Sequence, residues 1–292
     1  MNISSTLPEP TATPEPRRSD PVARVRDSEV HALLKSCLVS VTEAQVPDVA
    51  RLLDGRRSVD SLPSADRFLA LQALGTWHQL LAIAREFEAV QMRREIERAG
   101  QASDIPGSFA DVISAAAASG RTTASVATAL GKLRVAPTMT AHPTETKRVT
   151  VLETHRRIYR RLTELMGRNW APREQEAHLQ ALIAEIEILW LTGELRLEKP
   201  TVAQEVQWGL YFFREVLYTA VPALQDTLDH ALRQSYEGLT PAPFLRFSSW
   251  IGGDRDGNPH VTAAVTRAAL KEYRSAAIQS YRPALAGLCR DL

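Results

Sequence analysis

The sequence predicts a mainly α-helical chain that contributes about two β-strands to a helix-rich α/β barrel of the TIM type. Apolar residues recur at helical spacing over most of the chain after residue 23. Segments 133–140 and 244–251 instead suit short strands, and each leads into a polar loop and then a helix. Strand, loop and helix in that order form the repeating unit of such barrels. Because two strands do not close an eight-stranded barrel, we expect an incomplete one.

Three regions follow from composition and periodicity. Residues 1–22 hold five prolines among Ser, Thr and Glu and are expected to be a disordered tail. Residues 23–132 are expected to form a helical amino-terminal region, and residues 133–292 the barrel portion with inserted helices. The helices expected from periodicity are residues 65–99, 105–118, 122–130, 174–195 and 204–232, with a further helix after each polar loop.

Composition is that of an ordinary globular chain, with 44% hydrophobic and 24% charged residues. A net charge of +1 favours neither nucleic acid nor an anionic membrane as a partner. Cys37 and Cys289 are too few and too far apart for a disulfide framework or a zinc site. No apolar stretch reaches ~18 residues, and no signal peptide opens the sequence, so a cytoplasmic location is expected.

The loop after the second strand is the most informative segment. Residues 250–262 read Trp-Ile-Gly-Gly-Asp-Arg-Asp-Gly-Asn-Pro-His-Val-Thr, which suits a shaped polar site better than a solvated turn. A calcium loop is excluded, because Pro259 and Val265 stand where it needs Gly and Glu. Arg255 either binds an anion or forms an ion-pair network with Asp254 and Asp256, and the sequence leaves both alternatives open.

The loop after the first strand carries His142. Pro137 argues against a strand interior unless it lies at the strand's start or at an irregularity. A lone histidine is more often structural than catalytic. This histidine directly follows a strand and precedes Lys147 and Arg148, and in that context catalysis or ligand binding is as well supported as a structural role.

Both loops resemble signatures of the phosphoenolpyruvate carboxylase family. The first, Thr-Ala-His-Pro-Thr followed by Glu or Gln, two variable residues and Arg, is matched by residues 140–148. The second, Gly-Gly-Asp-Arg-Asp-Gly-Asn-Pro, is matched in full by residues 252–259. A softer match lies between them, at residues 189–201 and 221–222. Family members often have a second basic residue where this chain has Val149, so the chain resembles a divergent branch.

The resemblance implies a lyase that converts phosphoenolpyruvate and bicarbonate to oxaloacetate and phosphate, and so fixes carbon dioxide for the tricarboxylic acid cycle. It implies that His142 is catalytic and that Lys147, Arg148 and Arg255 bind substrate. The residues expected to shape the second loop are Gly252, Gly253, Asp254, Asp256, Gly257 and Asn258. Magnesium is implied as the cofactor, with its ligands expected beyond Leu292 and none in this chain. A homo-oligomer is also implied.

Family members are several times longer than this chain, which resembles their amino-terminal third. We therefore expect the 292-residue chain alone to be inactive and the complete protein to be active. One alternative is a non-catalytic homologue that binds an anionic metabolite or a protein partner. Val149 and the short chain favour it, and the intact loop 252–259 argues against it. Another is a different barrel enzyme of phosphorylated or carboxylic substrates, with His142 as a phosphoryl acceptor.

Overall fold

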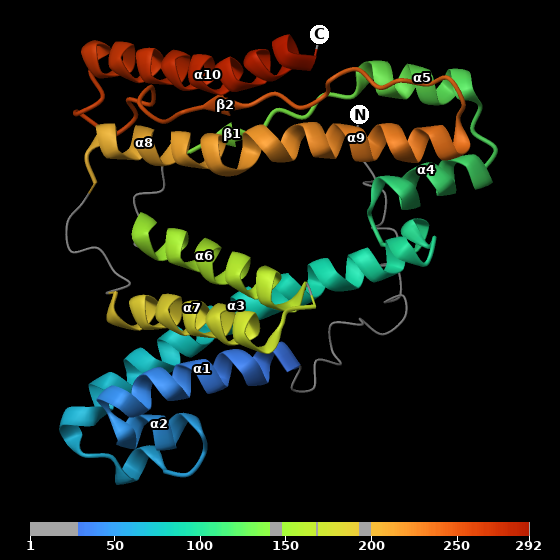
Figure 1. The fold of residues 1–292 in the computed structure, drawn as a ribbon. Coiled ribbons are helices and arrows are strands. Elements are labelled where there is room, and N and C mark those ends of the chain that lie inside the picture. Colours follow the sequence, from blue (N-terminus) through green and yellow to red (C-terminus); the bar gives the residue numbers. More distant parts are fainter. Residues whose placement is uncertain (1–28, 141–147, 168, 193–199, 292) are drawn as a thin grey trace, which may run out of the picture. The chain divides into compact units, whose positions relative to one another are not determined.

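The computed structural model describes residues 29–140, 148–167, 169–192 and 200–291. Most of these residues are helical, as predicted (Figure 1). The chain divides into two compact units, residues 1–77 and 78–292. The predicted disordered tail, residues 1–22, lies outside the described residues, as do His142 and Lys147.

The first unit contains α1 (Glu29–Gln45), α2 (Pro47–Leu53), the 3-10 helix η2 (Val59–Ser61) and the start of α3 (Ser64–Arg98). α1 and α2 pack together, and Leu34, Leu38 and Val49 are fully buried. Pro47 occupies the first turn of α2, where a missing N–H costs no hydrogen bond. Cys37 is a core residue, and burial raises the pKa of its thiol to about 11.

The second unit continues with the rest of α3, the 3-10 helix η3 (Ala102–Asp104), α4 (Phe109–Ala118), α5 (Thr123–Lys132), α6 (Val149–Met166) and α7 (Pro172–Leu191). α6 and α7 pack closely and bury Ile158, Leu162 and Ile186 completely. Across this pair, Arg157 donates to Glu185 at 2.7 Å. These buried residues lie at helical spacing, which is why periodicity located both helices.

The remaining helices of the second unit are α8 (Val202–Phe212), the π-helical turn η4 (Phe213–Leu217), α9 (Tyr218–Ser235) and α10 (Ala263–Asp291). In residues 204–232 the sequence predicts a helix that Pro222 bends or splits. The division instead falls at η4, and Pro222 lies inside α9. A π-helical turn widens the backbone, and such turns are most often single interruptions of an α-helix. α4 packs against α9 in a cluster that includes Ile113, Leu232 and Phe244.

The strands are short: β1 (Thr138–Met139) pairs in parallel with β2 (Ser248–Ser249). Both run between α8 and α10 (Figure 1), where Met139 and Ile251 join a cluster with Val206, Leu210 and Ala269. β1 begins directly after Pro137, and a strand start is one of the two positions that the sequence allowed for this proline. The described residues form a two-stranded sheet and no barrel, so the barrel assignment stays a prediction.

Within the described ranges, no helix combines the length and apolar character needed to cross a membrane.

The packing of α7 gives a matched stability test. Ile186 is fully buried, whereas Ile188, two residues later on the same helix, is 45% exposed. We expect Ile186→Ala to lower the free energy of unfolding by about 2–5 kcal/mol, because it leaves a cavity in the α6–α7 interface. Ile188→Ala should change it by less than about 1 kcal/mol. Urea unfolding followed by circular dichroism measures both, and equal losses would contradict this packing.

Candidate functional site

The two motif loops leave neighbouring parallel segments at the same end. Val135 N–H donates to Phe244 O and Arg246 N–H to Val135 O, both at 2.9 Å. Further along, Ser248 N–H donates to Pro137 O at 2.9 Å and Trp250 N–H to Met139 O at 2.8 Å. In this register Thr138 lies opposite Ser248. The segments that begin after Thr140 and Trp250 therefore start side by side, as predicted for a site at the carboxyl ends of barrel strands.

The second loop turns sharply at its start, and Gly252 makes that turn possible. Its φ of +75° is unfavourable for other residues. An added Cβ would also lie 2.6 Å from Ala269 Cβ on α10 and 3.1 Å from Val206 Cγ2 on α8. Gly257 has a φ of +65° but open space around it. Gly253 has neither constraint, since its added Cβ would make only an ordinary 3.7 Å contact with Trp250 O.

Side chains within the loop hold its later turns. The Oδ1 atom of Asp254 accepts the Asp256 N–H at 3.1 Å, and Asn258 Oδ1 accepts the His260 N–H at 3.1 Å. Such bonds from Asp or Asn to a backbone N–H two residues later stabilise compact turns. Asp254 and Asn258 thus fix local backbone shape, whereas Asp256 contributes its backbone N–H.

A cavity of about 290 Å³ lies where the two loops begin. Its lining consists of Thr140, Glu205, Trp250, Ile251, Gly252, Asp254, Asp256, Gly257, Asn258, Pro259, His260 and Val261. A larger cavity of about 730 Å³ between α8 and α10 adjoins it and shares Glu205, Asn258 and His260. Sequence reasoning missed Trp250, His260 and Glu205. His260 directly follows the glycine-rich motif and Trp250 precedes it by two residues, which is the signal that could have found them.

The charged residues that line the smaller cavity are Glu205, Asp254 and Asp256, besides the titratable His260. This described lining is acidic, so an anionic ligand needs positive groups from elsewhere. Arg255 is exposed and does not contribute to the lining. Within the described part of the loop, Arg255 forms no ion pair with Asp254 or Asp256. The described residues of the loop therefore do not contain the ion-pair network that the sequence left open.

Arg148 directly precedes α6 and has an exposed side chain. Its carbonyl accepts the Val151 N–H at 2.9 Å and so starts the helix. His142 and Lys147 belong to the segment between Thr140 and Arg148, outside the described residues. The structure therefore places the loop 252–259 and Thr140, the first residue of the first motif, at the strand ends, and Arg148 at the start of α6.

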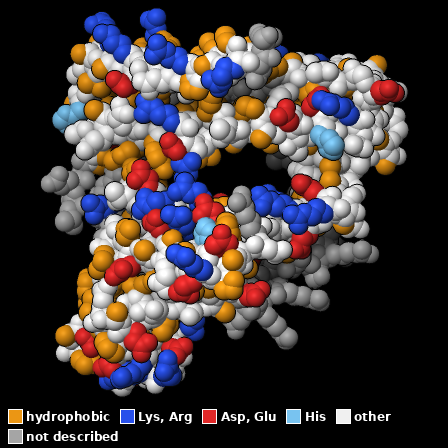
Figure 2. Space-filling model, in the orientation of Figure 1, with side chains coloured by type: hydrophobic (Ala, Val, Ile, Leu, Met, Phe, Trp, Pro, Cys, Tyr) orange, Lys and Arg blue, Asp and Glu red, His pale blue; other side chains and the backbone are white. Residues whose placement is uncertain are grey.

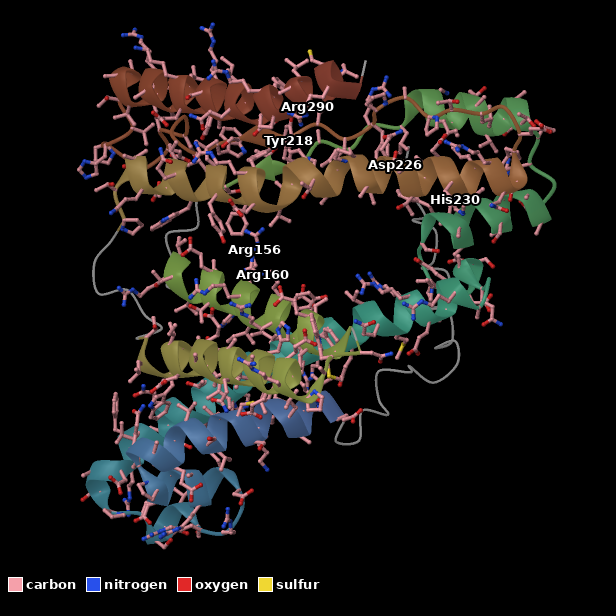
Figure 3. All side chains as sticks on the ribbon, viewed as in Figure 1. Arg156, Arg160, Tyr218, Asp226, His230 and Arg290 are labelled. Carbon is pink, nitrogen blue, oxygen red and sulfur yellow. The ribbon has the colours of Figure 1, made fainter. Side chains whose placement is uncertain are left out.

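Basic side chains also gather over α6, on the face drawn in Figure 2. Arg156 and Arg160 project from this helix (Figure 3), and with Arg157, Glu153, Tyr211 and Glu215 they line a cavity of about 260 Å³. Arg156 pairs with Glu215, which raises the pKa of its guanidinium. Arg157 pairs with Glu185. Two of these three arginines are thus already in ion pairs, which indicates a structural cluster.

The described side chains do not form a ready magnesium-binding site. No group of three or more His, Cys, Asp and Glu residues is arranged there to hold a metal ion. Asp254 and Asp256 are close in sequence, but Asp254 already accepts a backbone N–H. These residues do not fit a magnesium site.

A polar loop site at the carboxyl ends of neighbouring parallel strands is typical of α/β enzymes. A match to a known protein family identifies the class of protein more narrowly. The family model "Phosphoenolpyruvate carboxylase" matches residues 22–292. The chain belongs to the phosphoenolpyruvate carboxylase family.

Individual relatives agree with this assignment. The chain is 43% identical over 262 residues to the phosphoenolpyruvate carboxylase of Methylorubrum extorquens, covering 89% of this chain and 28% of that protein. It is 38% identical over 226 residues to the Rhodothermus marinus enzyme of the same name, covering 76% and 24%. It is 32% identical over 252 residues to the phosphoenolpyruvate carboxylase of Picea abies, covering 82% of this chain and 26% of that protein. The chain spans about a quarter of the length of these curated relatives.

The same substitution, Gly→Ala, is expected to lower the free energy of unfolding by different amounts at the three loop glycines. Gly252→Ala should lower the free energy of unfolding by about 2–4 kcal/mol, through a disfavoured φ and a clash with Ala269. Gly257→Ala, with a positive φ and open space, should cost about 1 kcal/mol. Gly253→Ala should stay within about 0.5 kcal/mol. Chemical denaturation of the three variants measures this order, and a Gly253 variant as damaged as the Gly252 variant would refute the loop geometry.

Proposed function

We propose that this chain is the part of a phosphoenolpyruvate carboxylase that supplies the two strand-end loops of its active site. The observation that carries the proposal is the parallel pairing that starts residues 140–148 and 250–261 side by side. Thr140, where the first motif begins, and the loop of the second motif line one cavity. Family membership adds phosphoenolpyruvate and bicarbonate as the proposed substrates.

The proposed reaction proceeds by transfer of phosphate and then of carbon dioxide. A bicarbonate oxygen attacks the phosphorus of phosphoenolpyruvate, a new P–O bond forms, and the bond to the enol oxygen breaks. The products of this step are carboxyphosphate and the enolate of pyruvate. Carboxyphosphate releases carbon dioxide and phosphate, and the enolate carbon attacks carbon dioxide to give oxaloacetate. Every reactant is anionic, so positive donors must hold them together.

His142 is the proposed catalytic residue for the carboxyphosphate and carboxylation steps, because an imidazole moves a proton near neutral pH. Arg148 and Lys147 are proposed to bind the phosphate and carboxylate groups. Arg255 is proposed to do the same, since its planar guanidinium suits both groups and it has no ion pair with its acidic neighbours. These cations would offset the acidic lining that Glu205, Asp254 and Asp256 provide.

Magnesium, a homo-oligomeric state and a cytoplasmic location belong to the proposal for the complete protein. Magnesium would contribute a positive charge that stabilises the phosphate and the enolate when bound. Because the chain spans about a quarter of its relatives, the assays below use the complete product of the reading frame that contains these residues.

In that complete product, His142→Asn should lower the turnover number by ~10²-fold or more, the usual loss for a positioned proton-transfer group. His230→Asn is the matched control, because His230 is exposed on α9, outside the strand-end cavity (Figure 3). Oxaloacetate formation from phosphoenolpyruvate and bicarbonate with magnesium measures both. Normal turnover of the His142 variant would contradict its role. No activity in the unaltered protein would favour the non-catalytic homologue.

Arg255→Lys tests the proposed anion contact, because lysine keeps the charge and loses the planar fork. We expect a rise in KM for phosphoenolpyruvate of about tenfold, the scale of one charge-assisted hydrogen bond. The melting temperature should not change, since Arg255 is exposed and forms no ion pair with Asp254 or Asp256. Unchanged kinetics would remove Arg255 from the site. A lowered melting temperature with normal kinetics would restore the structural alternative.

A further inference from the structure

Both backbone polar groups of Ile251 are bound by side-chain hydroxyls. Its N–H donates to Ser249 Oγ at 3.2 Å, and its carbonyl accepts the hydroxyl of Tyr273 at 2.5 Å. The two hydroxyls lie 3.2 Å apart. Ile251 lies between β2 and Gly252, at the point where the strand becomes the motif loop.

The protons of this network can be assigned from the directions of the bonds. The single hydroxyl proton of Tyr273 goes to Ile251 O, so Tyr273 Oη is the acceptor in its contact with Ser249. Ser249 therefore donates to Tyr273 while accepting from Ile251 N–H. Each group has one role, and the ring of bonds closes on a single residue of the loop.

Packing brings the hydroxyl of Tyr273 to this point. Tyr273 is on α10, and its ring packs against the cluster of Val206, Ile251 and Ala269. The Ile251 side chain is buried, and α8 approaches it so closely that a Cβ on Gly209 would lie 2.8 Å from its Cδ1 atom. The side chain of Ile251 is thus held by packing, and its backbone by two hydroxyls.

We propose that Tyr273 and Ser249 are positioning residues, whose hydroxyls fix the backbone of Ile251 and so aim the loop 252–259 at the strand-end cavity. The proposal rests on the proposed carboxylase function for its kinetic consequence. Neither residue needs to touch substrate, because both act through the Ile251 backbone. The sheet alone would anchor the loop only through the Trp250 N–H. The hydrogen bond from Tyr273 also links the loop directly to α10.

Conservative variants distinguish the effect of the hydroxyl groups from the effect of side-chain packing. Tyr273→Phe removes one oxygen and keeps the ring in the cluster. Ser249→Ala removes the other, and Ser249→Thr restores a hydroxyl there. Tyr281→Phe is the matched control, because Tyr281 is on the same helix, is 57% exposed and contacts Tyr218 at a ring distance of 6.2 Å, away from Ile251.

The first measurement uses the 292-residue chain and needs no activity. Trypsin cleavage after Arg255 under native conditions reports how often the loop opens. We expect Tyr273→Phe and Ser249→Ala each to speed this cleavage about 3- to 10-fold, the scale of one net hydrogen bond. Ser249→Thr and Tyr281→Phe should cleave at the unaltered rate. Equal rates for Tyr273→Phe and Tyr281→Phe would overturn the network.

The second measurement uses the complete product. Tyr273→Phe should lower kcat/KM for phosphoenolpyruvate about 10-fold at an unchanged melting temperature, and Ser249→Thr should recover what Ser249→Ala loses. The double variant of Ser249→Ala with Tyr273→Phe should lose less than the product of the single losses, since both act through one network. A kinetic loss that only follows a loss of folded protein would overturn the positioning role. An inactive unaltered protein would refute the proposed function, and proteolysis would still decide the network.

Discussion

The parallel pairing of segments 135–139 and 244–250 is the constraint on which the site depends. Four backbone hydrogen bonds between the two segments extend this pairing beyond the two-residue strands, from Val135 to Trp250. Pro137 lacks the N–H that would add another, yet its carbonyl accepts Ser248 N–H and so keeps the register. A slip by one residue would turn every side chain of a segment to the opposite face, and the loops would no longer open onto one cavity.

Small residues then let the helices close on the second loop. Gly209 on α8 leaves space for Ile251, and Ala269 on α10 lies where a Cβ on Gly252 would clash. Because interiors are close-packed, such contacts fix the loop more firmly than its few turn hydrogen bonds do. The resulting cavity carries acidic side chains, Glu205, Asp254 and Asp256. In the proposed function, the cations of the first motif and Arg255 would offset this acidic lining when an anionic substrate binds.

Much of this arrangement could be predicted from sequence, because it depends on local patterns. Periodicity located most of the helical segments from α3 onward, and Pro137 indicated either a strand start or an irregularity. The conformational requirement on the glycine pair was visible, but only the neighbours on α8 and α10 show that it falls on Gly252 and not Gly253. Glu205 and Tyr273 gave no signal, because each reaches the loop through packing of helices distant in sequence. Barrel closure stays a prediction, since it requires strands that are not among the described residues.

Amide hydrogen exchange across β2 tests the central pairing most directly. In the register described, the N–H groups of Arg246, Ser248 and Trp250 donate across the sheet, whereas those of Phe247 and Ser249 face away from β1. We expect slow exchange for the first three amides and faster exchange for the other two. The opposite alternation would indicate a register shifted by one residue, and uniformly fast exchange would indicate unpaired segments. Either result would contradict a shared site for the two loops.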